Sequence, residues 1–225
     1  TTRLLDYGSG VELLQLGIVQ RYLINDQLIT ETGLPERRGY SDVLLRGSTR
    51  VIDPFNLEAY VRYNPSIDRI VRSIVGMQYQ PGPFRTLNLT YRYARDISSQ
   101  WETSWQWPLY QPGGAPQRKA WNGSARSCGG AWYTVGRLIY NTDDRRLTDS
   151  VVGVEYDAGC WIARVAVSRW STGISEASTQ VLFQLELVGL SRLGSNAIGV
   201  MRDNIPGYQL LRERRSDSPA SAFYD

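Results

Sequence analysis

The side chains in this sequence that can do chemistry are two cysteines and a series of arginines. Cys128 and Cys160 are the only cysteines among the 225 residues. Two thiols can form a disulfide in an oxidising compartment or stay as inert thiols, and their number leaves both possibilities open. Histidine is absent from the sequence. This absence removes the most common general base and metal ligand.

The arginines are spread along alternating segments rather than gathered in one cluster. The net charge is only +3, which is too small to favour a nucleic-acid partner. Hydrophobic residues make up 42% of the chain and charged residues 21%, so the composition is not that of a disordered protein. Tyrosine (14) and tryptophan (7) outnumber phenylalanine (4). Aromatic side chains with a polar group suit membrane–water interfaces and sheet surfaces alike.

The elements that must position these residues are β-strands, and the clearest lie in Val151–Leu190. In its last segment one face is apolar and the other polar, because successive strand residues point to opposite sides. The apolar face carries Val181, Phe183, Leu185 and Leu187, and the polar face carries Gln184 and Glu186. Alternation of this kind is typical of a half-buried sheet or of the wall of a membrane barrel.

The whole chain contains about eleven such segments, counted from the alternation, with no convincing helix and no internal domain boundary. Several are ten residues or longer, and about nine to eleven residues allow a tilted strand to cross a bilayer. The sequence therefore predicts an all-β fold and favours an antiparallel transmembrane barrel. The sequence contains no run of about 18 apolar residues, so it predicts no transmembrane helix. Thr1 already lies in an expected strand, so we expect a piece of a longer or processed protein.

Several motifs resemble the LPS-assembly protein LptD family, also called the organic solvent tolerance protein family. The resemblance is carried in chain order by Ser41–Leu45, Trp105–Pro108, Gly153–Trp161, Gln180–Leu190 and Ile205–Tyr208. These motifs span almost the whole chain.

The resemblance implies the C-terminal part of an outer-membrane barrel of 26 strands in a Gram-negative bacterium. Residues 1–190 would be barrel strands and residues 191–225 a C-terminal periplasmic tail. The family inserts lipopolysaccharide into the outer leaflet through a polar lumen and a lateral gate. The lipopolysaccharide arrives from a periplasmic bridge protein through an N-terminal domain, and an LptE-type plug lipoprotein fills the lumen. Such transport implies no enzyme activity, no cofactor and no metal.

The same resemblance implies a position for the lateral gate, between the first and last barrel strands. Thr179–Val188 would be the last strand. Its lipid-facing residues would be Val181, Phe183, Leu185 and Leu187, and its lumen-facing residues Gln184 and Glu186. The barrel-assembly machinery would also recognise this strand by strand addition. The plainer interpretation of each residue is ordinary barrel wall.

Four arginines are expected to face the lumen. Because a guanidinium matches phosphate geometry, they are candidates to bind the substrate's phosphates. The plainer alternative, which we favour, is cross-strand pairing with Asp42, Glu58, Glu102 and Glu186. The arginines are Arg46, Arg62, Arg92 and Arg164.

Cys160 corresponds to the second of two adjacent family cysteines that bond to the periplasmic domain. Gly159 stands where the first would be, so the resemblance implies one interdomain disulfide from this position. Cys128 matches no family position. Strand counting places Gln111–Gly130 and the turn at Cys160 on the same, periplasmic, side, so a Cys128–Cys160 bridge remains an alternative.

Two other functions remain open from the sequence. A porin-like channel for small solutes explains the strands but not the motifs. A soluble β-sandwich that binds carbohydrate requires Trp101, Trp105 and Trp107 to line a groove. Detergent dependence separates the sandwich from the barrels, and association with a plug lipoprotein separates the two barrels.

Overall fold

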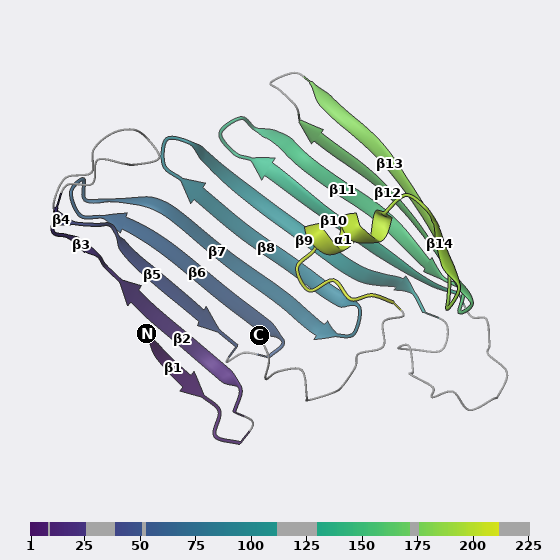
Figure 1. The fold of residues 1–225 in the computed structure, drawn as a ribbon, viewed down its shortest axis with the longest axis horizontal. Helices are drawn as coiled ribbons and strands as arrows, with labels where there is room; N and C mark the ends of the chain where they lie inside the picture. Colours follow the sequence, from purple (N-terminus) through teal and green to yellow (C-terminus); the bar gives the residue numbers. More distant parts are fainter. Residues whose placement is uncertain (9, 26–38, 51–52, 112–129, 172–175, 212–225) are drawn as a thin grey trace.

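The computed structural model describes residues 1–8, 10–25, 39–50, 53–111, 130–171 and 176–211 (Figure 1). Among these residues, one large antiparallel sheet dominates. The strands of this sheet are β1 (Thr2–Leu5), β2 (Glu12–Val19), β5 (Val43–Thr49), β6 (Phe55–Asn64), β7 (Arg69–Gly82), β8 (Arg85–Ala94), β9 (Ser98–Tyr110), β10 (Ala131–Asn141), β11 (Arg146–Asp157), β12 (Trp161–Ser171), β13 (Ala177–Leu187) and β14 (Ser191–Gly194).

The twelve strands follow one another in chain order, so each pairs with its sequence neighbours. A separate two-stranded ribbon joins β3 (Tyr22–Leu23) to β4 (Gly39–Tyr40) beyond one end of the sheet. This up-and-down order agrees with the predicted all-β, antiparallel fold. The free edges of the described sheet are β1 on one side and β13 with β14 on the other.

The sheet has two faces of opposite character, as the alternation predicted. On the outer face, the directly opposed residues Val152, Val167 and Val181 of β11, β12 and β13 are all exposed. On the inner face, Glu155 lies opposite Arg164, which in turn lies opposite Gln184. All three are buried. Over these strands the outer face is therefore apolar, and the inner face carries the buried charged and amide side chains.

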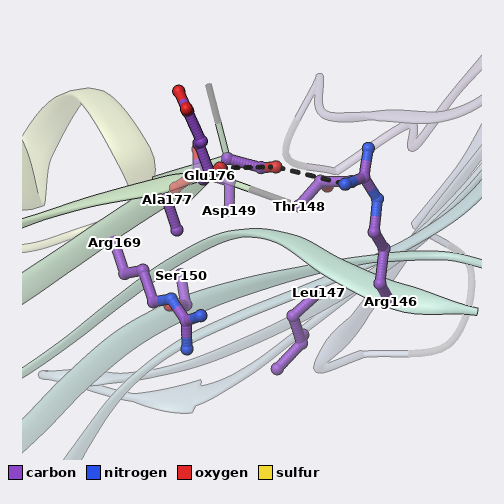
Figure 2. Close-up of a pocket in the computed structure, with 9 residues that line it drawn as sticks. Arg146, Leu147, Thr148, Asp149, Ser150, Arg169, Glu176 and Ala177 are labelled. Atoms are coloured by element: carbon purple, nitrogen blue, oxygen red, sulfur yellow. Dashed lines mark hydrogen bonds between the residues drawn. The ribbon is translucent and has the colours of Figure 1, made fainter. Parts of the chain in front are cut away.

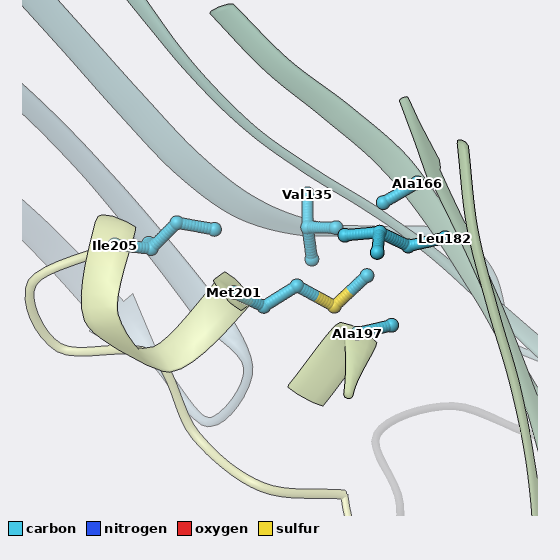
Figure 3. Packing of buried hydrophobic residues seen from close by; sticks show 6 residues of the cluster. All are labelled: Val135, Ala166, Leu182, Ala197, Met201 and Ile205. Carbon is cyan, nitrogen blue, oxygen red and sulfur yellow. The ribbon is translucent and has the colours of Figure 1, made fainter. Parts of the chain in front are cut away.

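The main apolar core lies on the inner face, beneath the helix α1 (Ala197–Asn204) (Figure 3). Its residues come from β10, β12, β13 and the helix with its C-cap, and they are Val135, Ala166, Leu182, Ala197, Met201 and Ile205. The helix residues are spaced by four, so they share one helical face. Asn196 caps the helix by accepting a 3.0 Å hydrogen bond from the Gly199 N–H.

The helix was not expected from the sequence, which showed no convincing helical segment. It is only eight residues long. Helices this short are marginal by themselves and depend on tertiary packing. Among the described residues, no helix is both long and apolar enough to cross a membrane.

Candidate functional site

The inner face of β11, β12 and β13 holds a buried ion cluster built on Arg164. Its Nε donates to Glu155 Oε1 at 2.8 Å and its Nη1 donates to Glu186 Oε2 at 2.7 Å. Arg164 is 1% exposed and Glu155 is 0% exposed. Buried charges need compensating partners. The guanidinium of Arg164 is therefore committed to two carboxylates.

Tyr208, which follows α1, completes this cluster. Its hydroxyl donates to Glu155 Oε1 at 2.6 Å. Burial raises the pKa of the Tyr208 phenol far above its usual range, and the neighbouring carboxylate of Glu155 raises it further. The phenol therefore stays protonated and keeps donating at neutral pH. Sequence reasoning missed both residues of this contact, because they lie 53 positions apart.

Three of the four predicted arginines form ion pairs on the inner face. Arg62 pairs with Asp42. Arg92 pairs with Glu102 at 2.9 Å. Within the described part of the chain, Arg46 forms no such pair with a carboxylate.

The pairing interpretation therefore describes Asp42, Glu102 and Glu186 correctly. Glu58 takes part in no ion pair of the described residues. Arg62 and Arg92 stay about half exposed despite their partners, so only Arg164 is fully enclosed. A phosphate-binding role for the exposed arginines stays a prediction.

The strand expected to be last, Thr179–Val188, corresponds to β13, and its faces are as predicted. Val181 and Phe183 are 67% and 52% exposed on the outer face. Gln184 is buried on the inner face, where its Oε1 accepts from the N–H of Ile198 at 2.9 Å. Leu185 and Leu187 lie on the outer face and are partly buried.

The structure adds one strand after β13. The four residues of β14 pair with Gln184–Leu187. In the described chain, the edge of β13 from Ala177 to Leu182 has no partner strand. Half of this edge is therefore covered and half is open. The gating role of the six predicted residues stays a prediction.

Aromatic residues on the outer face gather at two levels. At one level Tyr156 packs against Trp132 and Trp161, with ring centroids 4.6 and 5.2 Å apart. At the other level Trp101 packs against Tyr91 at 4.8 Å and lies opposite Tyr140.

β10 carries one residue of each level, at positions 132 and 140. These positions lie about 26 Å apart along the strand, at about 3.3 Å per residue. Two aromatic levels that flank an apolar band are typical of a membrane barrel.

The three tryptophans of the sandwich alternative lie on the outer face. Trp101 packs against Tyr91. Trp105 covers Gly136, where an added Cβ would lie 2.5 Å from the indole ring. Trp107 stacks toward Tyr79, with ring centroids 6.5 Å apart. Each indole therefore contacts a residue of another strand of the same sheet.

A small hollow of about 170 Å³ lies at the ends of β11, β12 and β13 that are distant from Cys160 (Figure 2). Its lining includes four charged residues, Arg146, Arg169, Asp149 and Glu176. Arg146 Nη1 donates to the Ser171 hydroxyl at 3.4 Å. The charged side chains that line the hollow are of both signs, so the hollow indicates no particular ligand.

Cys160 lies in the turn between β11 and β12, exposed and outside any disulfide of the described residues. Its carbonyl accepts from the Val188 N–H at 3.0 Å. Ala131, at the start of β10, lies opposite Asp157, so β10 begins at the same end of the sheet. Cys128 lies outside the described residues. Both pairings proposed for Cys160 stay predictions.

Comparison with known proteins identifies relatives of this sequence. Residues 1–120 match the family described as LptD, LPS transport system D. The LPS-assembly protein LptD of Polaromonas sp. (strain JS666) is 41% identical over 226 residues, which cover 100% of this chain and 27% of the relative.

Two further relatives carry the same name. The protein of Paracidovorax citrulli (strain AAC00-1) is 41% identical over 216 residues, covering 95% of this chain and 26% of the relative. The protein of Ralstonia nicotianae (strain GMI1000) is 33% identical over 218 residues, which cover 93% of this chain and 24% of the relative. The chain thus spans about a quarter of the length of the curated relatives it matches.

Proposed function

Because this chain belongs to the LptD family of LPS transport system D proteins, we propose that it is part of an outer-membrane barrel that inserts lipopolysaccharide into the outer leaflet. The observation that carries this proposal is the division of the sheet into an apolar outer face and a polar inner face. In a barrel, the outer face contacts lipid and the inner face lines the lumen. We place the described strands at the C-terminal end of a 26-stranded barrel.

The chemistry of this transport is the partitioning of an amphiphile. A lipopolysaccharide molecule has a charged, phosphorylated sugar head and several acyl chains. Exposing the head to hydrocarbon is costly, so the polar inner face accommodates it. The acyl chains leave through an opening in the wall. No step in this process needs a catalytic side chain, a cofactor or a metal.

The open part of the β13 edge is our candidate for one side of this opening. In the described chain, Ala177–Leu182 has no partner strand on the side away from β12, and Val181 and Phe183 present apolar side chains outward. A first barrel strand that pairs weakly here can separate and let the acyl chains pass. Gln184 and Glu186 face the lumen beside this edge.

We assign the contact with phosphate to Arg46, Arg62 and Arg92 rather than to Arg164. The first three side chains are exposed on the inner face, whereas Arg164 is enclosed by carboxylates. A guanidinium that keeps exposed N–H groups can still bind a phosphate.

We propose the partners from the family resemblance. An LptE-type plug lipoprotein contacts the inner face, and a periplasmic bridge protein delivers lipopolysaccharide through an N-terminal domain that precedes these strands. The barrel-assembly machinery recognises β13 by strand addition. Cys160 forms a disulfide with a cysteine of the periplasmic domain.

The test uses the full-length protein in cells, with a photocrosslinking amino acid on either face. Position 92 samples the inner face, and position 89 of the same strand samples the outer face. Newly made, pulse-labelled lipopolysaccharide should crosslink at position 92 early and disappear from it during the chase. Label at position 89 should appear later and persist. Absence of label at position 92, together with ion conductance of the purified barrel, would favour the porin-like alternative.

A further inference from the structure

The chain does not leave the sheet after α1 but turns back across its inner face. Figure 1 shows this segment in yellow, on the same face as the helix. Residues 205–211 run from beneath α1 to β8 and β9, where polar side chains bind them. We call residues 205–211 the return segment.

Side chains of the sheet hold the return segment mainly through its backbone. Asn88 Nδ2 donates to the Pro206 carbonyl at 2.9 Å. The Thr86 hydroxyl donates to the Gly207 carbonyl at 3.3 Å. Gln106 forms two bonds of 2.8 Å with the backbone N–H and carbonyl of Gln209.

These side chains form a continuous track across three strands. Gln78 of β7 lies opposite Asn88 of β8, and Thr86 of β8 lies opposite Gln106 of β9. Gln78 Nε2 makes a further, 3.4 Å contact with the Pro206 carbonyl. The bound segment begins with a turn, because the Tyr208 N–H donates to the Ile205 carbonyl at 3.0 Å. Side-chain amides and a hydroxyl that bind main-chain groups in this way recognise the shape of the backbone rather than its side chains.

Two positions of the return segment give the track its selectivity. Gly207 has φ +78°, and an added Cβ would lie 2.8 Å from Gln78 Nε2 and 3.3 Å from Thr86 Cγ2. The positive φ and these two close contacts together favour glycine at this position. Leu211 fills an apolar site formed with Tyr133 and Ile162.

The other end of the return segment is continuous with the edge of the sheet. Ser195 holds Phe183 of β13, because its hydroxyl accepts from the Phe183 N–H at 2.7 Å and its own N–H donates to the Phe183 carbonyl at 2.7 Å. The neighbouring β14 pairs with β13 over only four residues. The return segment is therefore connected, through α1 and Ser195, to a strand that is paired over only four residues.

We propose that Gln78, Thr86, Asn88 and Gln106 form a binding track for a peptide that makes this turn, and that the return segment occupies it as a latch that fixes β14 to the middle of the sheet. With the latch bound, β14 stays on β13. With the latch released, β14 and the edge of β13 open together. The track is also a site that a peptide of the same sequence can occupy.

The test measures amide hydrogen exchange in the full-length protein, purified in detergent together with its partners. Gly207→Val should release the latch, because the side chain meets Gln78 and Thr86. We expect amides of Ser191–Gly194 to exchange at least tenfold faster, since local opening is then easier. Gly10→Val is the matched control, because Gly10 has φ +69° with no atom within 4 Å of an added Cβ. Unchanged exchange in Gly207→Val would overturn the latch.

A second pair of variants keeps the test decisive if Gly207→Val does not assemble. Gln106→Ala removes both bonds to Gln209, and Gln100→Ala changes the same residue type on the same strand. Faster exchange of β14 in Gln106→Ala alone supports the latch. Equal exchange in the two variants contradicts it.

Binding in trans tests the track itself. A peptide of the sequence Ile-Pro-Gly-Tyr-Gln-Leu-Leu should bind Gly207→Val protein, or protein ending at Asn204 where that assembles. It should slow exchange of the Phe84 amide, which donates to Gln209 Oε1 at 2.9 Å when the latch is bound. The same peptide with valine in place of glycine should not bind. Equal behaviour of the two peptides would overturn the proposed selectivity. No readout here involves lipopolysaccharide, so failure of the latch is distinct from failure of the transport proposal.

Discussion

Arg164 is the residue on which the charges of the inner face depend. We predict that Arg164→Met lowers the free energy of unfolding by about 3–5 kcal/mol, because Glu155 and Glu186 then lose their shared cation while Glu155 stays buried. The measurement is the midpoint of heat or urea unfolding of the detergent-solubilised full-length protein, followed by gel mobility. Arg46→Met is the control, because Arg46 is exposed and makes no ion pair with a described residue. Equal midpoints for the two variants would show that the cluster is not needed for stability.

Tyr208 makes the stability that this cluster provides depend on pH in the alkaline range. Burial and Glu155 raise its pKa above the ordinary value of 10.0, whereas the unfolded chain ionises near that value. The stabilising effect of the neutral phenol is therefore fully present below about pH 10 and is lost as pH rises further. We predict that wild-type stability falls more steeply than that of Tyr208→Phe above pH 10, measured by urea unfolding. Parallel pH profiles would mean that Tyr208 is not buried against Glu155.

Single residues also show what sequence reasoning can reach. Alternation was enough to place Arg46, Arg62 and Arg92 on one face, because the period of a strand fixes its sides. The contact of Tyr208 with Glu155 was out of reach, because it depends on the path of the chain after the last long strand. The paired and unpaired states of the arginines likewise depend on strand register, which alternation does not specify.

At the scale of one strand, alternate residues of β12 point to the lipid-facing outer face and to the inner face. We predict that Val167→Arg costs about 2–4 kcal/mol and reduces the amount of assembled barrel, because a charge on the lipid face near the middle of the bilayer is poorly solvated. Gln180→Arg on the neighbouring β13 is the control, since it points to the inner face. The measurement is the fraction of heat-modifiable protein in outer membranes. Normal assembly of Val167→Arg would argue against a lipid-facing outer surface.

The elements that were missed are the ones whose structure depends on their surroundings. The four residues of β14 are too few to show a period of two. Ala197, Met201 and the C-cap residue Ile205 share one helical face, but the apolar Ile198 and Val200 lie between the first two and obscure the helical period. The helix therefore becomes recognisable only against Val135, Ala166 and Leu182. The long strands were predictable because each carries its own alternating signal.

At the scale of the whole molecule, Cys160 is the proposed covalent link to another domain. We predict that the full-length protein migrates differently on gels with and without reductant, and that Cys160→Ser removes this difference. Exposure of Cys160 at the end of the sheet makes it accessible to a partner thiol. Cys128→Ser is the comparison, and it should keep the shift. Loss of the shift in both variants, at unchanged mass, would indicate a Cys128–Cys160 bridge instead.

The two edges of the described sheet predict how the chain behaves alone. In the described chain, β1 has a partner on one side only, and along Ala177–Leu182 β13 has no partner strand on the side away from β12. Backbone groups left unpaired in hydrocarbon cost several kcal/mol each, so a spanning sheet must close on itself. We therefore predict that these 225 residues, produced alone, aggregate or pair edge to edge in detergent rather than give a heat-modifiable monomer. Co-production with the preceding strands of the full-length protein should restore a single closed barrel, measured by mass and gel mobility. A stable monomer that needs no detergent would contradict both the open edges and the membrane barrel, because such a chain would have to cover its apolar outer face by itself.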